Sequence, residues 1–461
     1  MVSLNGGYNI MSIYADDVVN FTSVLKIAYN FLTGREYLQK KKTKERKTLI
    51  SVASGFPDLV FAADSIPVFP IRMEKFKLNV YLLALNSATS LFGWNITTKL
   101  LGIARQVDFL KIVDTVLNDV INSINSKYNL LYDQAIKKNV SPEFCFGITS
   151  IYGMHVSEAN VCDCSLNFTL RCNKYSQYLK SLRSKIPNQI WVEIPPNDQI
   201  SKEKRLESMV ENLQKAILEI EGITGNLITD NSLNKQFRIG NQVKRYYKSI
   251  IHDVSTSDFY PCNPATFSEI LALLMISFQD YNSNAQRYLE NLSQLVKEIR
   301  DRVERGIGMN VSNMPRILLT PIFNGWEPEV QEIVYQLGGK VIYSDWDILG
   351  LLEEIPVSKD SNPVEMYAQF LLNASNKGLS CLNNCEALIN TYQKYIKKSR
   401  VDGVIINELV NCHLDSNCYD LLKNKIRNNL RLPSISIKFN KIGDNIEKIK
   451  IKLEPFMDLF S

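Results

Sequence analysis

The last third of the chain alternates short apolar runs with helix-patterned segments, and this alternation limits the folds that it can adopt. Four apolar runs predict buried strands at residues 316–323, 340–344, 401–407 and 434–439. Helical patterns lie between or after them, at residues 328–337, 384–398 and 445–456. Gly338-Gly339 ends the first of these helices, because glycine readily takes up the C-terminal cap conformation. Strand–helix repeats of this length predict a parallel sheet covered on both faces, so residues 313–461 are expected to form one α/β domain.

The first half shows a second α/β pattern, over residues 46–200. Its strand candidates are residues 48–53, 66–71 and 189–194. The segment Gly55-Phe56-Pro57 predicts a helix at residues 59–64, because proline fits the first turn of a helix. Residues 1–45 are expected to form an N-terminal helical segment. Residues 201–312 are expected to form a helical region that connects the two α/β domains, with one long helix capped by Thr266 and reaching Arg305.

Composition excludes several classes of protein. With 461 residues, of which 45% are hydrophobic, the chain can bury large cores. A net charge of +5 is small for this length and argues against a dedicated nucleic-acid-binding protein. No run of about 20 apolar residues predicts a membrane span, and the N-terminus lacks the apolar centre of a signal peptide. We therefore expect a cytoplasmic protein without nucleic-acid or membrane partners.

Three of the nine cysteines are placed where a parallel sheet would bring them to a ligand. In such sheets ligands bind beyond the carboxyl ends of the strands. Cys412 follows the apolar run at residues 401–410, and Cys172 opens a helix-patterned stretch after another apolar segment. Cys145 falls in the first turn predicted after Ser141-Pro142-Glu143, where a helix N-terminus favours the thiolate form. Thiols so far apart do not suit a zinc ribbon but could hold an iron–sulfur cluster between two domains.

Other assignments of these residues stay open. Each cysteine taken singly could be a small apolar group in a core. Cys162-Asp163-Cys164 and the pair Cys381 and Cys385 could each chelate a metal, although neither has the Cys-x-x-Cys spacing of a zinc knuckle. Cys162 or Cys164 could also replace Cys172 as a cluster ligand, and the two should point to alternate faces of an extended segment. The chain has no phosphate-binding loop, no His-Glu-x-x-His and no nucleophile elbow.

Four segments together resemble a known family. They are residues 54–68, residues 144–153 with 167–182 and 191–195, residues 316–345, and Val401-Asp402-Gly403-Val404-Ile405-Ile406 before Cys412. In their order and spacing, these segments are similar to the 2-hydroxyacyl-CoA dehydratase / benzoyl-CoA reductase family. That family places a cysteine where this chain has Ser54 or Gly55, and the difference is typical of the larger subunit.

The resemblance implies an α/β fold of two Rossmann-like domains and an enzyme subunit, either a dehydratase (lyase) or a benzoyl-CoA-reductase-type oxidoreductase. It implies a heterodimer with a smaller paralogous subunit, an ATP-dependent iron–sulfur activator protein, and an acyl-CoA substrate that reacts by one-electron, ketyl radical chemistry. It also implies a 4Fe–4S cluster held by three thiolates with one open position, which is the arrangement of catalytic metal sites generally. The ligands carried over are Cys145, Cys172 and Cys412.

Further residues are expected beside the cluster. His413 could move a proton or donate to a carbonyl, and Ser54 would line the cleft with Gly55 and Thr320 as positioning groups. Two other functions remain as alternatives. One is a scaffold or partner-binding subunit without a cluster, and the other is a double-cubane-type reductase of small molecules.

Overall fold

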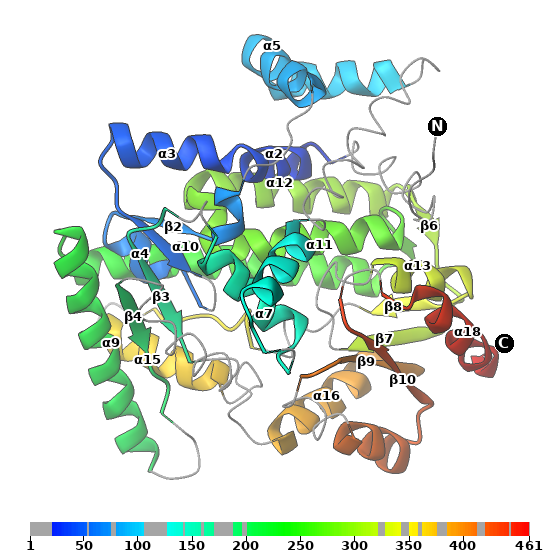
Figure 1. Ribbon diagram of the computed structural model, residues 1–461. Coiled ribbons are helices and arrows are strands. Elements are labelled where there is room, and N and C mark those ends of the chain that lie inside the picture. The colour runs from blue at the N-terminus through cyan, green and yellow to red at the C-terminus, as the bar shows by residue number, and fades with distance from the viewer. Residues whose placement is uncertain are drawn as a thin grey trace.

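The computed structural model describes most of the chain. The described residues are 21–52, 55–74, 80–105, 127–141, 143–157, 161–169, 188–195, 201–320, 328–342, 350–357, 362–375, 385–412, 420–441 and 444–460. Two four-stranded sheets, a short antiparallel pair of β5 (Phe259–Tyr260) with β6 (Met309–Asn310), and the helices around them make up the described fold, which is of the α/β class with Rossmann-like parallel sheets (Figure 1).

The first sheet lies in the N-terminal half. Its strands are β1 (Leu49–Val52), β2 (Ile66–Val68), β3 (Cys164–Phe168) and β4 (Gln189–Val192). They are ordered β2-β1-β3-β4, and every neighbouring pair is parallel. Alternate residues supply two cores, with Ile50 and Val52 in the large central cluster and Leu49 in a smaller cluster on the other face. Burial on both faces explains why these strands are short, continuous apolar runs.

The second sheet lies in the C-terminal half. Its strands are β7 (Arg316–Thr320), β8 (Lys340–Ile342), β9 (Gly403–Leu409) and β10 (Ser434–Phe439). The order is β10-β9-β7-β8, again with parallel pairs throughout. Leu318 packs in a core that includes α16 (Cys385–Ser399), whereas Ile317 and Leu319 face the central core with α13 (Pro328–Gln336) and α18 (Ile446–Met457). Both faces are covered, as the sequence pattern predicted.

The two sheets share one strand order. In each sheet the first strand lies inside, the second lies on one side of it, and the third and fourth follow on the other side. The chain therefore changes direction between β1 and β3 in one sheet and between β7 and β9 in the other. Ligands of open parallel sheets bind at such switch points, beyond the carboxyl ends of the strands.

Long helices occupy the region between the sheets in sequence. They are α9 (Lys202–Thr224), α10 (Asp230–Thr256), α11 (Pro264–Asp280) and α12 (Ala285–Glu304), and the last three run across the middle of Figure 1. The expected single helix from Thr266 to Arg305 is wrong, because it is two helices. Tyr281, Asn282 and Ser283 all have positive φ values of 36–55° and break the run.

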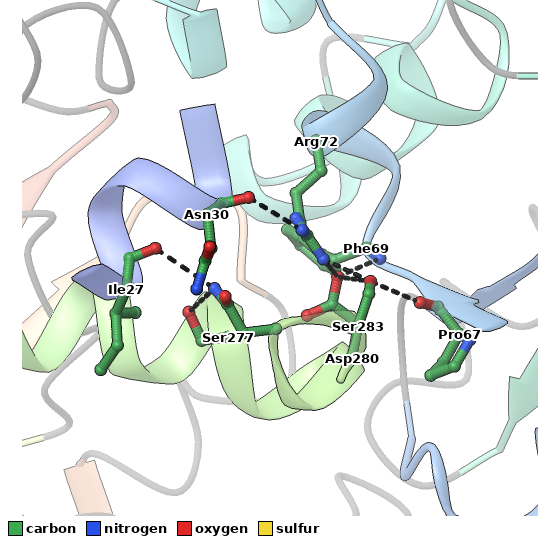
Figure 2. A network of polar contacts seen from close by, with 9 residues as sticks. Ile27, Asn30, Pro67, Phe69, Arg72, Ser277, Asp280 and Ser283 are labelled. Carbon is green, nitrogen blue, oxygen red and sulfur yellow. Dashed lines mark hydrogen bonds and ion pairs between the residues drawn. The ribbon is translucent and has the colours of Figure 1, made fainter. Parts of the chain in front are cut away.

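A buried polar network holds this break in place (Figure 2). Arg72, in the 3-10 turn after β2, donates to the Asp280 carboxylate at 2.7 Å, to the Ser283 hydroxyl, and to the Asn30 carbonyl at 3.0 Å. The Phe69 amide donates to the same Asp280 oxygen at 3.2 Å. Arg72 and Asp280 are 1% and 0% exposed, so the network ties the sheet edge to the helices inside the protein. A local sequence pattern cannot anticipate such a break, because its stabilising partner lies about 210 residues away in the chain.

The remaining helices surround these elements. They are α2 (Thr22–Leu32), α3 (Gly34–Lys44), α4 (Asp58–Ala62), α5 (Val80–Arg105), α7 (Phe146–His155) and α15 (Pro363–Ala374). Within the part of the chain that the structure describes, none of the helices has the length and apolar content needed to cross a bilayer.

Candidate functional site

Cys412 lies at the switch point of the second sheet. Strand β9 ends at Leu409, and the chain turns through Asn411, whose φ is +65°, so that the Cys412 amide donates to the Leu409 carbonyl at 3.1 Å. The Cys412 side chain is half-buried and packs against the central core. Thr320 ends the neighbouring strand β7, is fully buried, and pairs in register with Ile406 of β9. His413, the next residue, lies outside the described residues.

The corresponding edge of the first sheet is formed by the ends of β1 and β3. Ser54 and Cys172 follow these two strands in the chain, and both lie outside the described residues. Gly55 is buried where the chain leaves β1, and a Cβ atom there would lie 1.9 Å from Cδ2 of Phe168, the last residue of β3. Its role in the described structure is therefore close packing between the two switch-point strands, which only a residue without a side chain allows.

Cys145 stands at a helix start, but as the N-cap residue and not within the first turn as expected. Helix α7 begins at Phe146, and Cys145 is the N-cap residue with φ −67° and ψ 161°. Ser141 does not cap this helix. Instead its hydroxyl accepts from the Glu143 amide, and its carbonyl accepts from the Phe144 amide, in a turn that precedes the helix. The Cys145 side chain belongs to the central core and is 8% exposed.

Cys162 and Cys164 lie at the opposite end of β3. Cys164 opens the strand and pairs in register with Ile50, four residues before the carboxyl end at Phe168. At about 3.3 Å per residue, this places it roughly 13 Å from the switch-point edge. The two thiols pack in different cores, as predicted for alternate faces of an extended segment. Their position argues against either as a replacement for Cys172.

These two thiols are expected to resist alkylation in the folded protein. Burial raises the pKa of both Cys162 and Cys164 to about 12, and the nearby Asp163 carboxylate acts in the same direction. Since the thiolate is the reactive form, neither should be modified by iodoacetamide at a pH of about 8. Peptide mass spectrometry after native labelling measures this, with the urea-unfolded chain as the fully reactive control. Rapid modification of Cys164 in the native protein would contradict the burial described here.

Two of the three predicted cluster ligands therefore lie among the described residues. Cys145 and Cys412 both border the central core, and Cys172 follows the end of β3 in the chain. Among the residues that the structure describes, no three His, Cys, Asp or Glu side chains gather closely enough to hold a metal ion.

One pair of buried charged residues near the carboxyl end of β1 was not predicted from the sequence. Asp58 opens α4 just beyond Gly55, and Lys244 lies on α10, yet they are only 1% and 0% exposed. One signal was available. Lys244 continues the buried stripe of α10 at helical spacing between Phe237 and Ile251, where an apolar residue is expected.

The strand order and the switch-point residues place the chain in a definite class, that of α/β proteins with two Rossmann-like parallel sheets. Comparison with known proteins narrows the class. The family model described as 2-hydroxyglutaryl-CoA dehydratase, D-component, matches residues 121–460, and the chain belongs to this family. The match includes Cys145, Cys172 and Cys412, whereas Ser54 and the rest of residues 54–68 precede it. No curated protein matches the chain at a significant level.

Proposed function

We propose that this chain is the iron–sulfur subunit of a CoA-thioester dehydratase, with Cys145, Cys172 and Cys412 as the cluster ligands. The observation that carries the proposal is the match to the D-component family over residues 121–460, which contains all three cysteines. The placement of Cys412 at the β7/β9 switch point supports it independently, because that is where parallel sheets bind ligands.

The chemistry of the described donors fits such a cluster. Cys145 holds its thiol at the start of α7, where the helix dipole favours a bound anionic thiolate. Cys412 is half-buried at the end of a strand, so its thiol can meet a ligand without leaving the core. Both thiols are soft donors, the ligand type that holds iron–sulfur clusters in proteins.

When bound, a 4Fe–4S cluster with an open iron position supplies single-electron transfer to the thioester carbonyl. The chain's own residues hold and orient the reactants. Thr320 and the β7–β9 edge would position the acyl group, Ser54 and Gly55 would line the opposite wall, and His413 would hold or move a proton. We further propose a cytoplasmic heterodimer with a smaller paralogue, served by an ATP-dependent iron–sulfur activator.

Replacing Cys412 with serine is expected to remove at least half of the bound iron, because a hydroxyl is a much poorer cluster ligand than a thiolate. The same loss is expected for Cys145→Ser. The readouts are iron per chain and absorbance at about 400 nm after anaerobic purification. Cys164→Ala is the matched control, since this buried thiol lies at the far end of β3, and it should keep the wild-type iron content.

Two results would contradict the proposal. Full iron retention in Cys412→Ser would exclude this residue as a ligand. A wild-type protein that is colourless and iron-free when purified without oxygen would favour a scaffold subunit without a cluster. Calorimetric titration with 2-hydroxyglutaryl-CoA tests the substrate class separately, because binding of the thioester does not depend on which cysteines hold the cluster.

A further inference from the structure

Lys244 carries a charge into the centre of the protein without a hydrogen-bond partner among the described residues. Its side chain is 0% exposed, and its Nζ makes no hydrogen bond there. The ammonium instead lies 3.9 Å from the centre of the Phe370 ring on α15 and 5.2 Å from the centre of the Phe56 ring. Cation–π contacts of this kind replace only part of the lost hydration.

Asp58 is buried in the same way, two residues beyond Phe56. Neither of its carboxylate oxygens makes a hydrogen bond of ordinary geometry within the described structure. The Tyr281 hydroxyl lies beside it and lowers the pKa of Asp58, and a Cβ added at Gly240 would lie 2.7 Å from Asp58 Oδ1 and 2.8 Å from that hydroxyl. Asp58 therefore lies next to Tyr281, in the break between α11 and α12, and next to Gly240 on α10.

The surrounding ionisable groups leave Asp58 and Lys244 as each other's main counter-charge. The other groups that act on them, from each element packed nearby, are Tyr281, Tyr367, Lys248, Glu353 and Glu354. Burial raises the pKa of both tyrosines well above the usual value, so they stay neutral. Glu354 is engaged by Arg245 at 2.6 Å on the surface.

Burial outweighs the attraction between the two charges. It raises the pKa of Asp58 to about 6, although Lys244 lowers it, and it lowers the pKa of Lys244 to about 8, although Asp58 raises it. Both shifts favour the neutral forms. Between these two values both groups are nevertheless charged in the folded protein, so the pair is most unfavourable near neutral pH.

We propose that Asp58 and Lys244 form a buried charge pair that lowers the local stability of residues 55–62 at neutral pH. These residues include Gly55 and Phe56 at the carboxyl end of β1, so the pair would let this edge of the sheet rearrange when a ligand binds. The pair acts through the backbone and through Phe56, and it is therefore a positioning pair. Its link to thioester binding rests on the proposed function, but its effect on local stability does not.

The sign of the pH dependence follows from the two shifts. When residues 55–62 open and hydrate, Asp58 and Lys244 regain their ordinary pKa values of 3.8 and 10.5. Lowering the pH to about 5 protonates Asp58 only in the closed state, which stabilises that state. Raising the pH to about 9 deprotonates Lys244 only in the closed state, with the same effect. The opening constant should therefore be largest between about 6 and about 8, and about tenfold smaller at either extreme.

Hydrogen exchange of the full-length chain tests this inference, with amides of residues 55–62 followed by mass spectrometry and corrected for intrinsic rates. Amides of β9 serve as the internal reference. The wild-type protein should show the maximum of opening near neutral pH. The double variant Asp58→Asn with Lys244→Met should open at least tenfold less at a pH of about 7 and lose the pH dependence. Glu211→Gln with Lys215→Met, an exposed pair on α9, is the matched control and should behave as the wild type.

A flat wild-type profile, or a minimum of opening near neutral pH, would overturn the inference. So would a double variant that keeps the wild-type maximum. If the double variant fails to fold, the pH profile of the wild-type protein is sufficient to test the inference. Exchange needs neither substrate nor iron, so these outcomes are independent of the tests for ligands and thioester binding.

Discussion

Replacing Arg72 with methionine is expected to lower the free energy of unfolding by about 3–5 kcal/mol. Methionine can fill much of the same space but donates no hydrogen bonds. The variant would leave the Asp280 carboxylate 0% exposed, with the Phe69 and Asn282 amides and the Ser283 hydroxyl as its remaining hydrogen-bonding neighbours among the described residues. It would also strip the Asn30 carbonyl of its donor. Urea denaturation followed by circular dichroism measures the loss.

The pH dependence of this loss identifies its cause. Burial already raises the pKa of Asp280, and Arg72 works against that shift. Without Arg72 the pKa in the folded state rises further, so stability is present at low pH and is lost as the pH rises through that value. The loss in the free energy of unfolding caused by Arg72→Met should therefore be smaller at a pH of about 5 than at a pH of about 8. Arg305→Met is the control, because its ion pair with Asp301 is exposed and should change stability by less than about 0.5 kcal/mol. An equal loss in both variants would refute the role assigned to the network.

The positions of most strands along the chain could be predicted from the sequence because both sheets are buried on two faces, although β3 was not among the predicted strands. Such strands appear as continuous apolar runs, and the run predicted at residues 434–439 is β10 to the residue. The position of Cys412 followed from the same reasoning, since it lies just beyond such a run. Strand order was not predictable, because the pairing of β1 with β3 joins segments more than 100 residues apart.

The features that sequence reasoning missed depend on contacts between distant segments. Tyr281 and Ser283 adopt positive φ values because Arg72 and Asp280 hold the turn, and no local pattern contains that information. Lys244 was missed for a related reason. A lysine is almost never fully buried, so a charge on an apolar stripe was not expected to face the core. Both exceptions concern charged groups whose burial only the tertiary structure explains.

Replacing Gly55 with alanine is expected to destabilise the protein by about 1–3 kcal/mol through overpacking at the switch-point edge. The new Cβ would lie 1.9 Å from Phe168 Cδ2, so either the fully buried Phe168 ring or the chain beyond β1 must move. The ring has little freedom, because it packs edge-on against Phe56 with centroids 6.4 Å apart. Denaturation with urea gives the change in stability.

A double-mutant cycle separates this steric cause from a general effect of losing a glycine. Phe168→Ala removes the ring that the new methyl group would strike, so Gly55→Ala should cost much less in that background, with a coupling of about 1–3 kcal/mol. Gly222→Ala on α9 is the matched control: no heavy atom lies within 4 Å of its added Cβ, and it should be neutral or stabilising by about 0.4–1 kcal/mol. If Gly55→Ala proved as harmless as Gly222→Ala, the two switch-point strands would not be packed as closely as described.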